Sequence, residues 1–259
     1  MKTLRSIIAA LVLSVVFSSN VWAAPTVMEI LKKMEDIEFI GSDVIVKMKF
    51  TRQRRDEGAR ILESVFYRRD RDDSFLMVMT EPDNEKGNGY LRVGENMWMY
   101  RRNARTFQKM SRYQPIGGTD SRATDFEKRK YTELFEPVVD ENGREVLVEE
   151  TLGKAQIPVY YLEVKAKVKD LEFPKELYWV NKDTFLLMKT EQYSLSGTHM
   201  MTLYFTKYAT IEGKYIPSRI IIVDEFEKGN KTLLELSQVA LEDIDNEVFT
   251  KAYLENLSK

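Results

Sequence analysis

The chain has 259 residues, a net charge of −2 at neutral pH, one histidine and no cysteine. Charges of both signs are interspersed along it, which argues against a nucleic-acid or anionic-membrane partner, because such partners require a strongly basic surface. Without cysteine there is no thiol chemistry, and His199 alone cannot build a multi-histidine zinc site. We therefore expect no metal ion and no cofactor, and we interpret His199 as an ordinary turn residue.

Residues 1–23 have the layout of a secretory signal peptide. Lys2 and Arg5 precede an uncharged apolar run at 7–17, and small residues lead to a cleavage site after Ala23. The run is well short of the roughly 20 residues that span a bilayer as a helix. No cysteine follows it that could carry a lipid anchor. We therefore predict that the chain is exported, cleaved and released into the periplasm, leaving residues 24–259 as a single domain.

The first element of the predicted domain is an amphipathic helix at 26–39. Thr26 and Glu29 form a capping box, in which each side chain satisfies a free backbone amide at the start of the helix. Apolar residues then recur every three or four positions, which predicts one buried face. These residues are Val27, Ile30, Leu31, Met34 and Ile37.

From residue 44 the apolar pattern changes to strict alternation, which is typical of strands. The first strand is followed by a charged turn at 52–58. Turn residues separate the later strands by short intervals without helical patterns, so we expect sequential neighbours to pair antiparallel. The predicted strands lie at 44–50, 59–69, 75–80, 90–93, 97–101, 106–110, 145–151, 158–166, 175–180, 185–193, 199–208, 215–224 and 231–241.

The centre of the chain interrupts this series of strands. Residues 113–121 include Pro115 and two adjacent glycines, and Thr124 with Glu127 forms a second possible capping box. We therefore predict an irregular insertion followed by a helix at 125–135. Long insertions of this kind are more often functional than decorative. A last short helix is expected at 249–257.

The predicted fold class is mainly β (α+β), with one large antiparallel sheet that curls into a barrel, splits into a sandwich or stays half closed. Methionine and aromatic residues are frequent in the strands, and methionine adapts to variable apolar partners. They fill either an ordinary core or a lipid-sized cavity beneath the helices. The residues expected to line such an apolar cavity are Val46, Met48, Phe50, Phe66, Met77, Met79, Leu91, Trp98, Tyr100, Tyr160 and Leu162.

Several segments resemble the LolA-like, outer-membrane lipoprotein-sorting family. In residues 89–100, Gly94-Glu95-Asn96 joins one strand to a second that contains Trp98 and Tyr100, and an apolar strand ending at Pro82 precedes them. Residues 176–182 with 189–193 are similar to the family's Trp-Val-(Asp/Asn)-Lys strand pair. Segments 215–218 and 249–254 complete a match that covers the whole mature chain.

The resemblance implies a half-open β-barrel whose concave apolar face is capped by helices. The central insertion departs from the family pattern, since residues 118–126 match only in fragments. The family also carries an arginine that holds the lid shut, for which Arg68 or Arg69 is the candidate. The residues expected in the lid are Ile30, Leu31, Met34, Phe126, Leu134, Arg68 and Arg69.

By this resemblance the chain is a monomeric, non-enzymatic periplasmic carrier for lipoprotein acyl chains or other lipids. It would receive cargo from an inner-membrane transporter and deliver it to an outer-membrane acceptor. An envelope-stress sensor of the same fold is an alternative. A hydrolase using paired carboxylates, Asp72/Asp73 or Glu149/Glu150, is a weaker one, because adjacent residues on a strand point to opposite faces.

Overall fold

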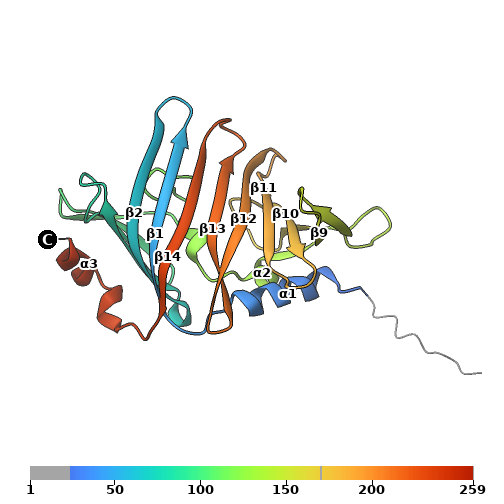
Figure 1. The fold of residues 1–259 in the computed structure, drawn as a ribbon, viewed down its shortest axis with the longest axis horizontal. Coiled ribbons are helices and arrows are strands. Elements are labelled where there is room, and N and C mark those ends of the chain that lie inside the picture. The colour runs from blue at the N-terminus through green and yellow to red at the C-terminus, as the bar shows by residue number, and fades with distance from the viewer. Residues whose placement is uncertain (1–23, 170, 259) are drawn as a thin grey trace, which may run out of the picture.

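The computed structural model describes residues 24–169 and 171–258, so the predicted signal peptide lies outside the described residues. Fourteen strands form one antiparallel sheet in this part of the chain (Figure 1). The strand order is β6-β5-β4-β3-β2-β1-β14-β13-β12-β11-β10-β9-β7, and β8 pairs with β9. The end strands β6 and β7 do not pair, so the sheet is curled but unclosed, as the half-open barrel requires.

The strands follow the predicted alternation closely. Those of the first half are β1 (Val44–Arg54), β2 (Gly58–Arg69), β3 (Ser74–Glu81), β4 (Gly89–Val93), β5 (Asn96–Arg101), β6 (Thr106–Lys109) and β7 (Phe135–Pro137). Those of the second half are β8 (Leu147–Leu152), β9 (Ile157–Ala166), β10 (Lys175–Asn181), β11 (Leu187–Tyr193), β12 (His199–Ile211), β13 (Lys214–Asp224) and β14 (Lys231–Leu241).

Helices are short and lie outside the sheet. They are α1 (Val27–Glu38), α2 (Tyr131–Leu134) and α3 (Lys251–Leu257), with 3-10 turns η1 (Asp70–Asp72), η2 (Ala123–Phe126) and η3 (Asn246–Phe249). The capping box of α1 is confirmed: the Glu29 amide donates to Thr26 Oγ1 at 3.2 Å, and the Thr26 amide donates to Glu29 Oε2 at 2.8 Å. No helix in the described part of the chain is both long and apolar enough to cross a membrane.

We call the face covered by α1, α2 and the central insertion (residues 110–134) the inner face, and the opposite one the outer face. In Figure 1 the insertion passes behind the strands, α1 runs along one lower edge and α3 lies at the other end of the sheet. Two apolar clusters lie on the inner face, one beneath α1 and one beneath the insertion. A third lies on the outer face, where η3 and α3 cover β3 to β5.

Two predicted boundaries are wrong. The turn at 52–58 is shorter than expected, because β1 continues to Arg54 and leaves only residues 55–57 in the turn. The helix at 125–135 is also wrong, since η2 ends at Phe126 and α2 begins only at Tyr131. Glu127 caps nothing, because Arg92 and Arg112 bind its carboxylate.

Strand alternation also corrects three predicted cavity residues. Leu91 pairs with Trp98 across β4 and β5, and both point with Tyr100 to the outer face. Their neighbours Tyr90 and Met97 point to the inner face instead. Because β4 and β5 are apolar on both faces, composition alone could not indicate which set faced inward.

Burial of Leu254 holds α3 against the outer face. Leu254 is fully buried against a cluster that includes Leu76 and Leu91. Gly89 permits this contact, because a Cβ added there would lie 2.5 Å from Leu254 Cδ1. The C-terminal helix therefore covers the outer face where Gly89, which has no side chain, leaves room for Leu254.

We predict that Leu254→Ala lowers the free energy of unfolding by about 2–5 kcal/mol, the usual cost of removing a buried leucine side chain. Leu257→Ala, the same change in the same helix at a position 47% exposed, should cost less than about 1 kcal/mol. Urea unfolding of both variants measures the difference. Equal effects would show that α3 does not dock through Leu254.

Candidate functional site

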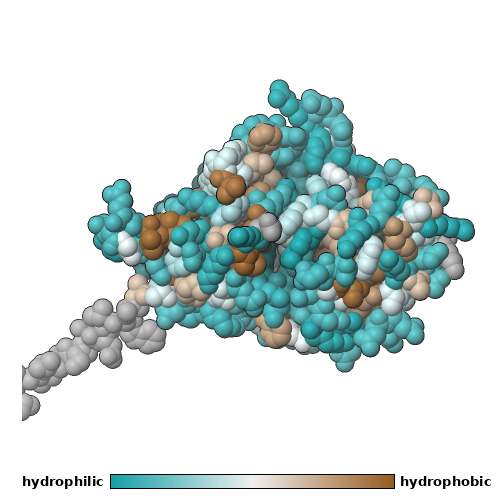
Figure 2. Space-filling view, turned by 180° about the vertical axis from the view of Figure 1, so that it is seen from behind, coloured by the Kyte–Doolittle hydropathy of each residue, from teal (hydrophilic) through white to brown (hydrophobic). Residues whose placement is uncertain are grey.

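An apolar cavity of about 100 Å³ lies on the inner face between the strands and the insertion. Its walls come from β1, β2 and the strands β12 to β14, and its polar rim includes Glu38, Arg68 and Arg129. Figure 2 shows the molecule from the insertion side, where hydrophobic residues form only small, separate patches. The insertion and α1 therefore cover most of the apolar surface beneath them.

The predicted cavity residues separate into groups. Val46, Met48 and Phe66 line the apolar cavity. Phe50, Met77 and Met79 belong to the same inner-face cluster, whereas Tyr160 and Leu162 lie in the cluster beneath α1. Sequence reasoning missed the wall contributed by the later strands, although their alternation was visible. This wall consists of Phe205, Ile216, Ile220, Leu234 and Leu236.

Phe126 fills the space above the apolar cavity. Its ring centroid lies 5.5 Å from that of Phe66 and 6.2 Å from that of Phe50. The side chain is buried, and it comes from the insertion rather than from the sheet. The remaining volume is below the roughly 300–1,000 Å³ typical of small-molecule sites. An acyl chain therefore fits only if Phe126 or its neighbours move.

The first half of the insertion is fixed firmly to the sheet. Arg54 donates through Nη1 to Asp120 Oδ2 and through Nη2 to the Gly118 carbonyl, both at 2.9 Å. Thr232 on β14 donates to the same Asp120 oxygen at 2.7 Å and accepts from the Asp120 amide at 3.0 Å. The two Thr232 contacts are buried, and the four bonds together hold residues 118–120 against β1 and β14.

The second half of the insertion is joined to α1. The Thr132 amide and hydroxyl donate to Glu35 Oε1 at 2.6 and 2.9 Å, and the Tyr131 hydroxyl donates to Glu38 Oε1 at 3.0 Å. The predicted lid residues of α1 are buried in the apolar cluster between the helix and the sheet, and Leu134 packs against the same cluster. The helix and the second half of the insertion therefore form one connected cover. The α1 residues concerned are Ile30, Leu31 and Met34.

The register of β2 places the two candidate lid arginines on opposite faces of the sheet. Arg68 lines the inner cavity and donates through Nε to Asp70 Oδ1 at 2.6 Å. Arg69 lies on the outer face, where it donates to Asn246 at 2.7 Å and its guanidinium carbon lies 4.2 Å from the Phe249 ring centroid. Arg69 as a lid residue is thus wrong, because adjacent strand residues face opposite ways. Arginines missed by the sequence reasoning, Arg54 and Arg92, hold the insertion instead.

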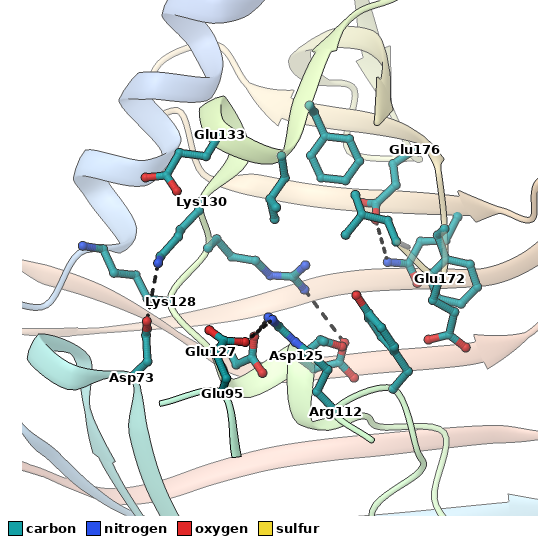
Figure 3. A pocket seen from close by; sticks show the side chains of 18 of the residues that line it. Asp73, Glu95, Arg112, Asp125, Glu127, Lys128, Lys130, Glu133, Glu172 and Glu176 are labelled. Atoms are coloured by element: carbon teal, nitrogen blue, oxygen red, sulfur yellow. Dashed lines mark hydrogen bonds and ion pairs between the residues drawn. The ribbon is translucent and has the colours of Figure 1, made fainter. Parts of the chain in front are cut away.

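A second, charged cavity of about 240 Å³ lies beside the apolar one (Figure 3). Lys130 pairs with Asp73 at 3.4 Å on one side, and Glu172 and Glu176 lie on the other. Glu127 contacts both Arg92 and Arg112. Asp125, Glu127 and Arg129 line both cavities, so polar and apolar space meet at these three residues.

The acids around Arg129 are held in an unusual electrostatic setting. Burial raises the pKa of Asp125 and of Glu176, and the attraction of Arg129 only partly opposes it. Burial alone would lower the pKa of Arg129, but surrounding acidic groups raise it above its ordinary value. These groups are Tyr131, Asp125, Glu176 and Glu38. Burial thus disfavours the ionised forms of these carboxyls, and the one cation that they share offsets this only in part.

The polar residues that the sequence singled out for possible chemistry have separate partners in the described part of the chain. Within the described residues, no group of three or more histidines and carboxylates could hold a metal ion. His199 stacks on Tyr193 with centroids 4.9 Å apart and contacts Thr202. Of the carboxylate pairs, Glu149 binds Lys182 while Glu150 accepts from Trp179 Nε1. The two members of this pair therefore have separate partners.

Comparison with known proteins supports the fold directly. The sequence model of a family described only as an uncharacterized protein matches residues 71–256. The chain belongs to this family. A LolA superfamily protein from Nitrosomonas europaea is 24% identical with a TM-score of 0.73, and the match covers 89% of this chain and 100% of that one.

Two other solved structures share the fold. An outer membrane lipoprotein-sorting protein domain from Vibrio parahaemolyticus is 17% identical with a TM-score of 0.75, covering 88% of this chain and 97% of that one. A DUF1329 family protein from Desulfovibrio piger is 18% identical with a TM-score of 0.74 and the same coverage. No curated protein matches the sequence. The resemblance to LolA-like proteins is thus confirmed for the fold.

We predict that Glu176→Gln stabilises the protein increasingly as pH rises. Because the folded-state pKa of Glu176 is raised, its ionisation disfavours the folded state, and this effect is absent below the unfolded value of about 4.3. The difference in melting temperature between variant and parent should be near zero at acid pH. It should become positive as pH rises above the unfolded pKa, and it should level off above the folded-state pKa.

Glu163→Gln is the matched control for this prediction. Burial opposes ionisation of Glu163, but hydrogen bonds from Lys175 and Tyr161 outweigh it and lower its pKa. Ionised Glu163 therefore stabilises the fold above the unfolded pKa, and this contribution is lost as pH falls through the folded value. The variant should be less stable than the parent at neutral pH. The same sign for both variants would contradict this assignment of charges.

Proposed function

We propose that the mature chain is a periplasmic carrier that encloses acyl chains of lipoproteins or other lipids and passes them toward the outer membrane. The apolar cavity beneath a two-part cover is the observation that carries this proposal. The LolA-like fold and the predicted signal peptide support it. Binding here is non-covalent and needs no catalytic group.

The energetics suit a carrier. Burial of an acyl chain contributes about 0.8 kcal/mol per methylene, so even a partly enclosed chain binds usefully. The cavity is too small for such a chain while Phe126 occupies its upper part. Cargo therefore enters as Phe126 and the cover withdraws, and it leaves when they return. This exchange couples binding to the position of the insertion.

Release requires a partner that moves the cover or competes for the ligand. An inner-membrane transporter as donor and an outer-membrane acceptor fit this requirement. The second half of the insertion suits such a role, because it is joined to α1 by side-chain contacts of Glu35 and Glu38. The first half stays fixed to β1 and β14 through Asp120.

Native mass spectrometry of the mature protein purified from cells tests the proposal. We expect co-purified lipid or lipoprotein, and uptake of a fluorescent fatty acid by the lipid-free protein. If neither is observed, the carrier function is wrong.

Filling the apolar cavity should block this uptake. Leu236 lines the cavity and is only partly buried, so Leu236→Trp places its ring in the ligand's space without a large change in the core. We expect affinity for the fluorescent fatty acid to fall roughly tenfold, equivalent to about two methylenes of lost burial. Leu195→Trp, the same change at a side chain 91% exposed, should leave affinity unchanged. Equal affinities of the two variants would exclude this cavity as the binding site.

Removing Phe126 should act in the opposite direction. Phe126→Ala creates the space that cargo otherwise has to open, so we expect tighter binding of the fluorescent fatty acid. The same change should lower the free energy of unfolding by about 3–5 kcal/mol, as for other buried phenylalanines. Phe226→Ala, at a phenylalanine 66% exposed, is the control and should alter neither quantity. Weaker binding by Phe126→Ala would show that Phe126 contacts cargo rather than excluding it.

A further inference from the structure

The charged cavity continues the apolar one rather than standing apart from it. Asp125, Glu127 and Arg129 line both, so a ligand with one polar and one apolar end could occupy the two together. The polar end would then lie inside the protein, under the insertion. This arrangement selects among lipids by their headgroups as well as by their chains.

The charges that line this cavity are mixed, with an excess of acid. Seven carboxylates and five cationic side chains surround it. A purely anionic headgroup would add to the negative excess, whereas a headgroup that carries an ammonium would offset it. Two buried carboxylate oxygens, Glu127 Oε1 and Glu172 Oε2, form ion pairs with arginines but have no hydrogen-bond partner of good geometry in the described residues. They retain capacity to accept from a ligand amine.

Arg129 supplies the complementary group for an anion. In residues 24–169 and 171–258 its one ion pair is with Asp125, at 3.9 Å, and its guanidinium makes no hydrogen bond. A guanidinium has five donors in a planar fork that matches phosphate oxygens. Of the other cations of the cavity, Arg92 and Arg112 pair with Glu127 and Lys130 pairs with Asp73, whereas Lys128 lies over the Phe39 ring at 4.5 Å. Arg129 therefore has the most free donors at the junction of the two cavities.

We propose that the charged cavity binds the headgroup of a zwitterionic phospholipid, with the phosphate on Arg129 and the amine among the carboxylates of Glu172 and Glu176. The acyl chains then extend past Asp125 and Arg129 into the apolar cavity. This inference rests on the proposed carrier function and narrows its cargo. A volume of 240 Å³ accommodates a compact headgroup.

The electrostatics of the charged cavity agree with this assignment. Burial raises the pKa of Asp125, Glu172 and Glu176, and the arginines beside them oppose this only in part. An ammonium among them would add positive charge. The bound lipid would thus complete the network that Arg129 balances only in part.

A lipid-competition experiment tests the proposal. Lipid-free mature protein is incubated with vesicles of equal parts phosphatidylethanolamine, phosphatidylglycerol and diacylglycerol with identical acyl chains, then reisolated, and its lipids are quantified by mass spectrometry. We expect phosphatidylethanolamine to be enriched at least tenfold over each of the others. Uptake of all three in equal proportion would overturn the headgroup site while leaving the carrier function intact. Uptake of none would overturn both.

Substitutions of Arg129 test whether this residue determines the headgroup preference. Arg129→Gln and Arg129→Lys should each reduce the preference for phosphatidylethanolamine over diacylglycerol about tenfold. The lysine variant keeps the charge and the fold but lacks the planar fork. Arg144→Gln, at an exposed arginine paired with Asp140, is the control and should leave the preference unchanged. Unchanged preference in the Arg129→Lys and Arg129→Gln proteins would contradict the role of Arg129.

Competition by phosphoethanolamine, which is the headgroup without acyl chains, distinguishes a site for a lipid from a site for a free phosphate compound. Phosphoethanolamine should compete only at concentrations far above those of the lipid, because it lacks the chains that fill the apolar cavity. Tight binding of phosphoethanolamine with no preference among the three lipids would overturn the proposal.

Discussion

The structure depends on one constraint: an open sheet with an apolar inner face has to be covered. Closure into a full barrel would bury that face by itself, but the end strands β6 and β7 do not pair with each other. An uncovered face of this size would be an exposed hydrophobic patch. The helix α1 and the insertion provide the cover, and because they are separate from the sheet, the interface between them can also receive a ligand.

The cover is attached in two different ways. Hydrogen bonds of Asp120 with Arg54 and Thr232 fix its first half to the sheet. The second half contacts α1 through Glu35 and Glu38 and reaches the cavities through Arg129. The two halves of the cover are thus held by different elements, the first by strands of the sheet and the second by α1.

Local sequence patterns predicted the sheet well, because alternation in β1 and the capping box of α1 are determined by neighbouring residues. These patterns failed where contacts between residues far apart in sequence determine the local structure or the face to which a side chain points. Glu127 reads as a helix cap, yet Arg92 and Arg112 bind its carboxylate, and residues 127–130 form no helix. Trp98 points outward because η3 and α3, more than 140 residues later, cover that face. The charged cavity was missed for the same reason, since Arg129 and Glu176 meet only in the folded chain.

The most direct measurement of the central claim is photo-crosslinking with a fatty acid that carries a diazirine near its methyl end. Mass spectrometry of the crosslinked mature protein then identifies the residues next to the chain. The account predicts adducts on the inner face, at Val46, Met48, Ile220 and Leu236. Adducts confined to the outer face around Leu76 and Leu254, or none at all, would contradict it.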